Sequence, residues 1–217
     1  MTPPKYSSDE FSGRYGPWAL VTGAAVGLGA EFSRQLATQN INLVLVDIDK
    51  DNLALCADQL QQQFSVEVFC IELDLASNNF LDVIIAQLDG REIGLLVNNA
   101  GVPHMGDFLS QSHNFLIKQL NVNVHAVMLL THHFGQEMVE RGKGGIIILS
   151  SMAALNGGAV NANYSASKAY DLVLAESLWA EWKSKGVDVL GFMPWKTATP
   201  GYFNDPTGDS KDVLTVE

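Results

Sequence analysis

Short apolar runs alternate along the chain with longer segments in which apolar residues recur at every third or fourth position. Apolar runs of this length predict buried strands, whereas the wider spacing predicts helices. The predicted strands lie at residues 18–22, 41–46, 66–71, 94–98, 145–150 and 187–193. The predicted helices lie at residues 27–39, 50–63, 78–89, 112–140 and 163–185.

This order of elements predicts an α/β fold, a doubly wound parallel sheet of the Rossmann-like kind. Continuously apolar strands, such as residues 146–149, suit a parallel sheet that is buried on both faces. No linker or repeat divides the chain, so we expect a polar tail at residues 1–15 and a single domain at residues 16–217. Ligands of such folds bind at the carboxyl ends of the strands.

Composition narrows the classes of function. The 217 residues are 47% hydrophobic, enough for one sizeable core. A net charge of −11 and an isoelectric point near 4.7 argue against a nucleic-acid partner. The apolar runs fall far short of the ~20 residues that a membrane span needs. Two cysteines give no disulfide framework and favour a reducing cytoplasm, and the five histidines show no metal-binding spacing.

A glycine-rich turn joins the first predicted strand to the first predicted helix. Gly23 permits a tight turn, Gly27 lets backbone N–H groups approach a pyrophosphate, and Gly29 allows the helix to pack closely on the strand. The N-terminus of that helix then faces the anion. Glycines at this spacing also mark ordinary turns, but their position between strand and helix favours a dinucleotide site.

Asp47 ends the second predicted strand, where an acidic side chain accepts hydrogen bonds from the adenosine ribose. The same carboxylate repels a 2′-phosphate, and the next residues, Ile48 and Asp49, offer no cation to bind one. We therefore expect NAD as the cofactor, with NADP disfavoured. A solvated turn residue is the alternative interpretation.

Ser151, Tyr164 and Lys168 form the candidate proton-transfer group. At the start of a helix, residues four positions apart share one face, which places the Lys168 ammonium beside the Tyr164 phenol. A phenol with a pKa of about 10 becomes a usable base when a fixed cation stabilises its phenolate. A tyrosine and a lysine on an ordinary amphipathic helix would show the same spacing, so the other motifs decide.

Together these residues resemble the short-chain dehydrogenase/reductase family from about Gly16 to Thr199. The resemblance implies catalytic roles for Asn123, Ser151, Tyr164 and Lys168. The cofactor site that it implies comprises Gly23, Gly27, Leu28, Gly29, Asp47, Asp74, Leu75, Asn98, Ala100, Tyr164, Lys168 and Thr199. No metal site is expected.

The family roles are specific. Asp74 matches a residue near the adenine, and Thr199 matches one that touches the nicotinamide amide. The run that begins at Asn98 matches a motif that supports the central sheet and lies along the cofactor. The resemblance implies that Tyr164 exchanges a proton with a substrate alcohol or ketone while Ser151 holds the substrate oxygen. It also implies that Lys168 tunes the phenol and binds the ribose. Asn123, for which Asn121 is a weaker alternative, positions a water that connects Lys168 to solvent.

Substrate identity stays open. Residues that could line an apolar pocket are His104, Met152, Leu155, Met193, Trp195 and Tyr202. They suggest a hydrophobic secondary alcohol or ketone, although apolar stripes are as often plain core. The run that starts at Tyr15 is similar to the beginning of hydroxysteroid and ketoacyl reductases, which commonly prefer NADP.

Two departures from the family pattern favour a competing interpretation. Trp195 follows Pro194 where relatives have glycine, and the chain stops at Glu217, so we expect its C-terminal part to be missing. A catalytically silent dinucleotide-binding or interaction module is therefore the alternative. Apolar residues on several faces of helices 112–140 and 163–185 also predict a homo-oligomer through these helices.

Overall fold

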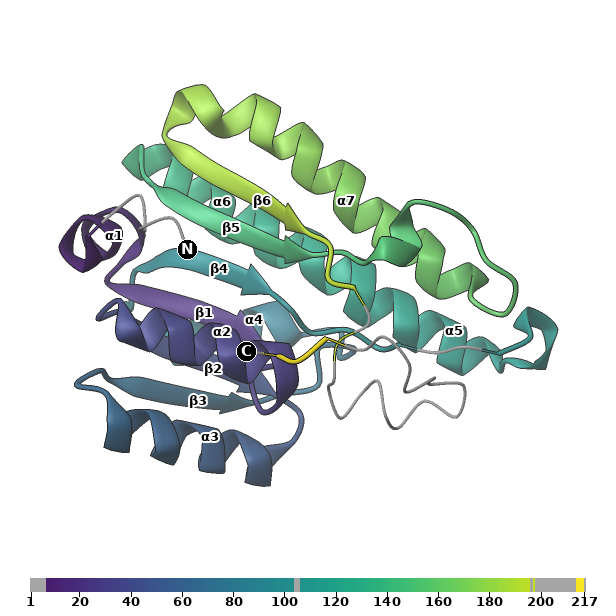
Figure 1. Ribbon diagram of the computed structural model, residues 1–217, viewed down its shortest axis with the longest axis horizontal. Coiled ribbons are helices and arrows are strands. Elements are labelled where there is room, and N and C mark those ends of the chain that lie inside the picture. Colours follow the sequence, from purple (N-terminus) through teal and green to yellow (C-terminus); the bar gives the residue numbers. More distant parts are fainter. Residues whose placement is uncertain (1–6, 104–105, 196, 198–213, 217) are drawn as a thin grey trace.

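The computed structural model describes residues 7–103, 106–195, 197 and 214–216. Six parallel strands form one sheet in the order β3-β2-β1-β4-β5-β6 (Figure 1). They are β1 (Trp18–Thr22), β2 (Asn42–Asp47), β3 (Val68–Glu72), β4 (Ile93–Asn98), β5 (Gly144–Leu149) and β6 (Val187–Phe192). The strand order reverses between β1 and β4, which confirms the predicted doubly wound α/β fold.

Helices connect the strands. They are α1 (Ser8–Tyr15), α2 (Gly27–Thr38), α3 (Lys50–Gln63), α4 (Phe80–Leu88), α5 (His113–Leu120), α6 (Val127–Arg141) and α7 (Ala162–Trp182). Short helical turns η1 (Phe108–Ser110), η3 (Met152–Ala154) and η4 (Lys183–Lys185) precede α5 and flank α7. The predicted helix 112–140 is interrupted by a π-helical segment, η2 (Asn121–Ala126), between α5 and α6.

Both faces of the sheet are covered because alternate strand residues point to opposite sides. Ala19 and Val21 of β1 pack with residues of α2 and α3, whereas Leu20 packs with residues of α4 and α6. Figure 1 shows α2 and α3 in front of the sheet, with α4, α6 and α7 on the opposite side. The carboxyl ends of the central strands meet at one edge of these layers, where the candidate site lies.

Residues 8–15 form helix α1, which was not among the predicted helices. Ser7 and Glu10 form a capping box that fixes the first turn of α1. At the other end, the Tyr15 hydroxyl donates to Asp188 Oδ2 at 2.7 Å, and Arg14 Nε donates to the same oxygen at 2.8 Å. Burial, with Asp188 beside it, raises the pKa of Tyr15 to about 12. These contacts join α1 to β6.

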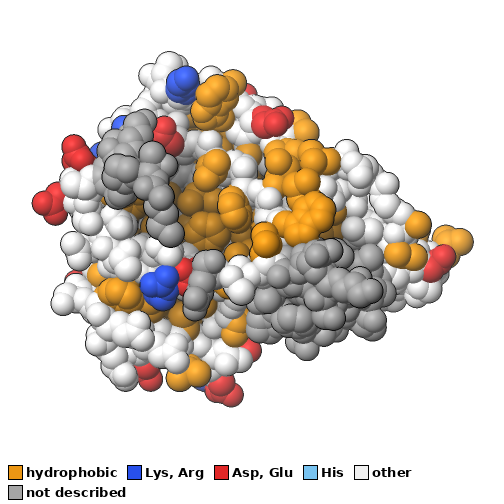
Figure 2. Space-filling view, viewed as in Figure 1, with side chains coloured by type: hydrophobic (Ala, Val, Ile, Leu, Met, Phe, Trp, Pro, Cys, Tyr) orange, Lys and Arg blue, Asp and Glu red, His pale blue; other side chains and the backbone are white. Residues whose placement is uncertain are grey.

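On the side of α2 and α3, part of β6 has apolar side chains that remain exposed in the described structure. Leu190 and Phe192 of β6 point to this side, and their side chains are 54% and 37% exposed. Figure 2 shows hydrophobic side chains gathered over β5 and β6 on this face. Within the described residues, none of the helices combines the length and the apolar character that crossing a bilayer requires.

Candidate active site

The glycine turn approaches β4 so closely that side chains cannot fit. Gly23 and Gly27 have φ values of +63° and +62°, in the left-handed region where glycine is unstrained. A Cβ atom on Gly29 would collide with the carbonyl oxygen of Gly23 and with the Asn99 amide. The first turn of α2 therefore lies directly against the ends of β1 and β4.

Thr22 and Asn99 hold this turn in place. The Thr22 hydroxyl accepts hydrogen bonds from the backbone N–H groups of Asn99 and Ala100, each at 3.1 Å. The Asn99 side-chain amide donates in return to the carbonyls of Thr22 and Gly23, each at 2.8 Å. Thr22 is not among the predicted site residues, and Asn99 was predicted only as a member of the run that begins at Asn98. The sequence feature that could have identified them is the presence of short polar side chains at the ends of β1 and β4, which are adjacent strands.

The N-terminus of α2 fits the pyrophosphate of a dinucleotide. Its N-cap residue, Val26, makes no side-chain hydrogen bond to the helix, and the first turn carries no acidic residue. The first N–H groups of a helix lack intrahelical partners and attract anions. Gly27 and the half-buried Leu28 lie in this first turn, so the predicted residues and the open helix end coincide.

Asp47 and Ile48 lie at the carboxyl end of β2, beside the turn. Asp47 Oδ2 accepts a hydrogen bond from Ala25 N at 2.9 Å, which ties the carboxylate to the glycine turn. Its other oxygen accepts from Asp49 N at 3.0 Å. Ile48 is 57% exposed and supplies no positive charge. This end of β2 thus presents one carboxylate and an apolar side chain to a ligand.

The remaining predicted cofactor residues follow β3 and β4. Asp74 accepts from Ala76 N at 2.9 Å and lies 3.5 Å from the Lys118 ammonium, while Leu75 is buried. Asn98 is also buried, and its amide donates to Thr131 Oγ1 of α6 at 2.9 Å. That bond supports the predicted structural role of the residue, since it joins the sheet to a helix. Thr199 lies outside the described residues.

Ser151 and Tyr164 lie on two segments that pack together. Ser151 follows β5 and caps η3, where its Oγ accepts a hydrogen bond from Ala153 N at 3.2 Å. Tyr164 lies in the first turn of α7, and η3 packs against this helix. Both side chains are partly exposed, so a ligand can reach them.

Lys168 is one helical turn beyond Tyr164 and is buried, with 4% of the residue exposed. Its ammonium donates to the Leu149 carbonyl at 2.7 Å and to Asp171 Oδ2 at 2.9 Å. Two of its three protons are thus used within the described part of the chain, which leaves one for a ligand. Burial raises the pKa of Asp171 to about 6, although the Lys168 ammonium opposes this shift. Asp171 is absent from the predicted site.

Asn123 lies in η2 and is fully buried. Its Oδ1 accepts from Val102 N at 2.7 Å, and its Nδ2 donates to Ser167 Oγ at 3.1 Å and to the Val102 carbonyl at 3.3 Å. The side chain therefore connects the segment after β4 to α7 at the point where the helix deviates from α geometry. This geometry favours a positioning role for the side chain.

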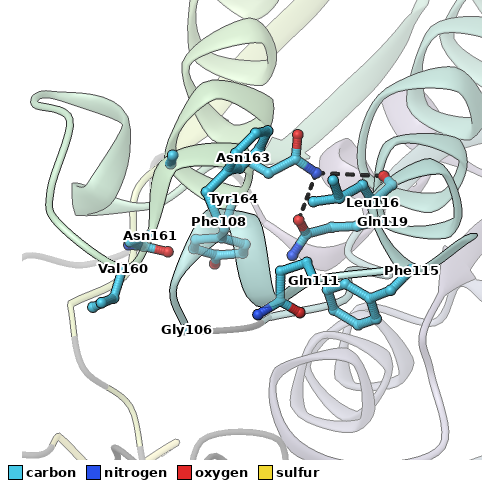
Figure 3. Close-up of a pocket in the computed structure, with 11 residues that line it drawn as sticks. Gly106, Phe108, Gln111, Phe115, Leu116, Gln119, Val160, Asn161, Asn163 and Tyr164 are labelled. Atoms are coloured by element: carbon cyan, nitrogen blue, oxygen red, sulfur yellow. Dashed lines mark hydrogen bonds between the residues drawn. The ribbon is translucent and has the colours of Figure 1, made fainter. Parts of the chain in front are cut away.

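A hollow opens beside Tyr164, between α5 and the start of α7 (Figure 3). Phe108 and Val160 line it with apolar groups, and Gln119 accepts a hydrogen bond from Asn163 at 2.7 Å along one wall. Asn161 Oδ1 is buried there without a partner in the described structure. Of the residues predicted to line a pocket, Met152, Leu155, Met193 and Trp195 do not line this hollow, and His104 and Tyr202 lie outside the described residues.

Comparisons with known proteins agree with this geometry. A family profile described as "short chain dehydrogenase" matches residues 17–205. The very-long-chain 3-oxoacyl-CoA reductase of Mus musculus is 34% identical over 207 residues, which cover 93% of this chain and 66% of that protein. The inactive hydroxysteroid dehydrogenase-like protein 1 of Homo sapiens is also 34% identical, over 86% of this chain and 57% of its own length.

Among solved structures, the short-chain dehydrogenase from Sphingobium yanoikuyae in complex with NADPH has a TM-score of 0.86 and 29% sequence identity. The match covers 93% of this chain and 80% of that one. The chain thus spans less than two thirds of the curated relatives' length but most of this structural neighbour.

Proposed function

Because the chain belongs to the short-chain dehydrogenase family, we propose that it transfers a hydride between a nicotinamide dinucleotide and the oxygen-bearing carbon of a hydrophobic alcohol or ketone. The observation that carries this proposal is the placement of Ser151 just after β5 and of Tyr164 and Lys168 on α7, at the same sheet edge as the open N-terminus of α2. A dinucleotide that lies across the edge would bring its nicotinamide to these side chains.

When bound, the dinucleotide would supply or accept the hydride. The Tyr164 hydroxyl donates a proton to the substrate oxygen in reduction and takes it back in oxidation. Ser151 Oγ donates a hydrogen bond to the same oxygen and holds it in reach of the phenol. Lys168 contributes its remaining N–H to the ribose, and Asn123 keeps η2 and α7 in register around it.

The end of β2 supports NAD as the preferred cofactor. A 2′-phosphate would meet the Asp47 carboxylate and the exposed Ile48, whereas ribose hydroxyls could donate to Asp47. The NADPH complex of the Sphingobium yanoikuyae enzyme shows that a structural neighbour uses the other cofactor. Titration with both cofactors separates the two outcomes.

The substrate class is a carbonyl next to an acyl or similarly long apolar chain. Phe108, Leu116 and Val160 give the hollow beside Tyr164 an apolar wall. The name of the mouse relative, a very-long-chain 3-oxoacyl-CoA reductase, supports a 3-oxoacyl thioester. Amides such as Gln111 at the same hollow would accommodate a polar group near the reacting carbon.

Turnover of 3-oxoacyl thioesters and bulky ketones, with NADH and NADPH, tests the proposal. Tyr164→Phe should abolish turnover and leave dinucleotide affinity nearly unchanged, because only the ionisable oxygen is removed. Tyr170→Phe is the matched control, since Tyr170 is an exposed tyrosine on the same helix. Sizeable activity in Tyr164→Phe would refute the acid–base role.

A catalytically silent dinucleotide-binding module is the second candidate. The observation in its favour is that a relative named as inactive is as similar to this chain as the mouse reductase is. This candidate predicts dinucleotide binding without turnover of any substrate in the panel. Turnover that is lost in Tyr164→Phe would exclude it.

We further propose that the protein is a cytoplasmic homo-oligomer. Val173 and Trp179 of α7 are 60% and 51% exposed, as is expected of residues that meet another subunit. Other apolar residues of α6 and α7 are packed within the chain: Val127 and Leu130 are buried in the core, and Trp182 packs on Gly135. The surface available for assembly is therefore smaller than the sequence pattern suggested.

A further inference from the structure

A carboxylate is buried beneath the catalytic lysine. Asp171 lies three residues after Lys168, on the side of α7 that faces the sheet, and has 0% exposure. Aspartate is almost never fully buried unless it is paired, and such a position in a helix is usually apolar. The proposed chemistry assigns no role to this side chain.

The contacts of Asp171 are unequal. Oδ2 accepts the Lys168 ammonium at 2.9 Å, whereas Oδ1 is buried with no hydrogen-bond partner in the described residues. A half-satisfied carboxylate in the interior costs free energy, so its pairing with Lys168 is the one contact that offsets this cost. The ammonium is fixed at the same time by the Leu149 carbonyl at 2.7 Å.

The surroundings contain few other charges. In the described structure, no further ionisable side chain makes an ion pair or hydrogen bond with Lys168 or Asp171. The groups that pack around the pair are the neutral Asn123 of η2, the carbonyl of Leu149 in β5 and the backbone of Gly101 after β4. On α7 itself, the titratable neighbours are Tyr164, one turn before Lys168, and Tyr170, whose pKa is raised by burial and, to a smaller extent, by the Asp171 carboxylate.

A pair of opposite charges acts on a nearby phenol differently from a single ammonium. An isolated cation stabilises phenolate and lowers the pKa of a tyrosine. An adjacent carboxylate contributes an interaction of opposite sign, so it offsets part of the effect of the ammonium. The Asp171 carboxylate therefore reduces the effect of the Lys168 charge on the Tyr164 phenol.

We propose that Asp171 is a positioning residue that holds Lys168 and offsets its charge, so that Tyr164 remains a neutral, proton-donating phenol up to higher pH than Lys168 alone would allow. This inference rests on the acid–base role proposed for Tyr164. It assigns to Asp171 control over the pH range in which the site donates rather than accepts a proton.

The ionisation of Asp171 agrees with this role. Burial raises its pKa to about 6, with the Lys168 ammonium acting in the opposite direction. The carboxylate is therefore charged at and above neutral pH. Below that pKa the pair is broken and the Lys168 charge is no longer offset.

Titration of Tyr164 in Asp171→Asn tests the proposal. The ultraviolet absorbance of phenolate is followed with rising pH, with and without the substitution. Each protein is paired with a second form that also carries Tyr164→Phe, and the difference between the two curves removes the signal of the other four of the five tyrosines. The midpoint for Tyr164 should fall by about one pH unit or more when the carboxylate is removed. Glu176→Gln is the matched control, since it removes the same charge from an exposed site on α7 and should leave the midpoint unchanged.

An unchanged or higher midpoint in Asp171→Asn would overturn the proposal, as would an equal fall in Glu176→Gln. If circular dichroism shows that Asp171→Asn does not fold, Asp171→Leu is titrated instead, because leucine fills the buried position with an apolar side chain. A lower Tyr164 midpoint then supports the proposal, and an unchanged or higher midpoint overturns it. The titration needs neither cofactor nor substrate. If Asp171→Asn lowers the Tyr164 midpoint but the unaltered protein shows no turnover, only the proposed function is refuted. If the unaltered protein shows turnover but the midpoint does not fall, only this inference is refuted.

Discussion

The buried carboxyl group of Asp171 should make folding stability depend on pH in a way that Asp171→Asn removes. Its pKa is about 6 in the folded protein, against the ordinary aspartate value of 3.8, which represents the unfolded chain. The folded state thus binds the proton more tightly. This contribution to stability is fully present below about pH 4 and is lost as the pH rises through about 6.

The size of the effect follows from the shift. One pKa unit corresponds to about 1.4 kcal/mol, so the difference between 3.8 and about 6 corresponds to about 3 kcal/mol. We expect the free energy of unfolding of the unaltered protein, minus that of Asp171→Asn, to fall by this amount across the window and to be constant above it. Other titrating groups cancel in the subtraction.

Urea unfolding, followed by the fluorescence of the four tryptophans, measures this difference at a series of pH values. Dilute protein is required because the isoelectric point near 4.7 lies inside the window. Glu176→Gln serves again as the control and should show a constant difference. A difference that is flat or rises with pH for Asp171→Asn would refute the reasoning, since it would mean that pairing with Lys168 outweighs burial.

Three further predictions concern the cofactor, the fold and assembly. NAD(H) should bind at least about tenfold more tightly than NADP(H), and Asp47→Ser with Ile48→Arg should reverse that preference in a binding titration; equal affinities in the unaltered protein would contradict it. Gly29→Ala should lower the free energy of unfolding by about 1–3 kcal/mol and weaken dinucleotide binding, because the new methyl group meets the glycine turn; unchanged urea midpoints would argue against the close contact. Trp179→Glu should convert an oligomer to monomer in light scattering, whereas a monomer at micromolar concentration before substitution would count against the α7 interface.

The sequence predicted the layers of the fold because strand and helix periodicities are local properties. All six strands lie within two residues of their predicted bounds, since buried parallel strands such as β5 are apolar throughout. The strand ends could be identified in the same way, and this placed Gly23, Asp47 and Ser151 at one edge of the sheet. Their roles stay predictions until a ligand is bound.

What the sequence did not reveal depends on contacts between distant residues. The helix α1 was not predicted, and it is anchored by Asp188 of β6, more than 170 residues away. Asp171 is a different case: three residues after Lys168 it falls on the same helix face, so helical periodicity alone placed a carboxylate next to the ammonium. That signal is local and could have been used.

The attachment of α1 to β6 also constrains the order in which the protein can assemble. Arg14 and Tyr15 leave the ribosome early, whereas Asp188, which both of them contact, emerges only after most of the chain has been made. The β1–β2 unit can pair while synthesis continues, because its strands are close in sequence. The α1 helix therefore cannot complete its contacts until β6 has joined the sheet, so its docking reports that β6 is in place. A version of the protein that begins after Tyr15 would lose this docking step and leave Asp188 without the two partners that it has in the described structure.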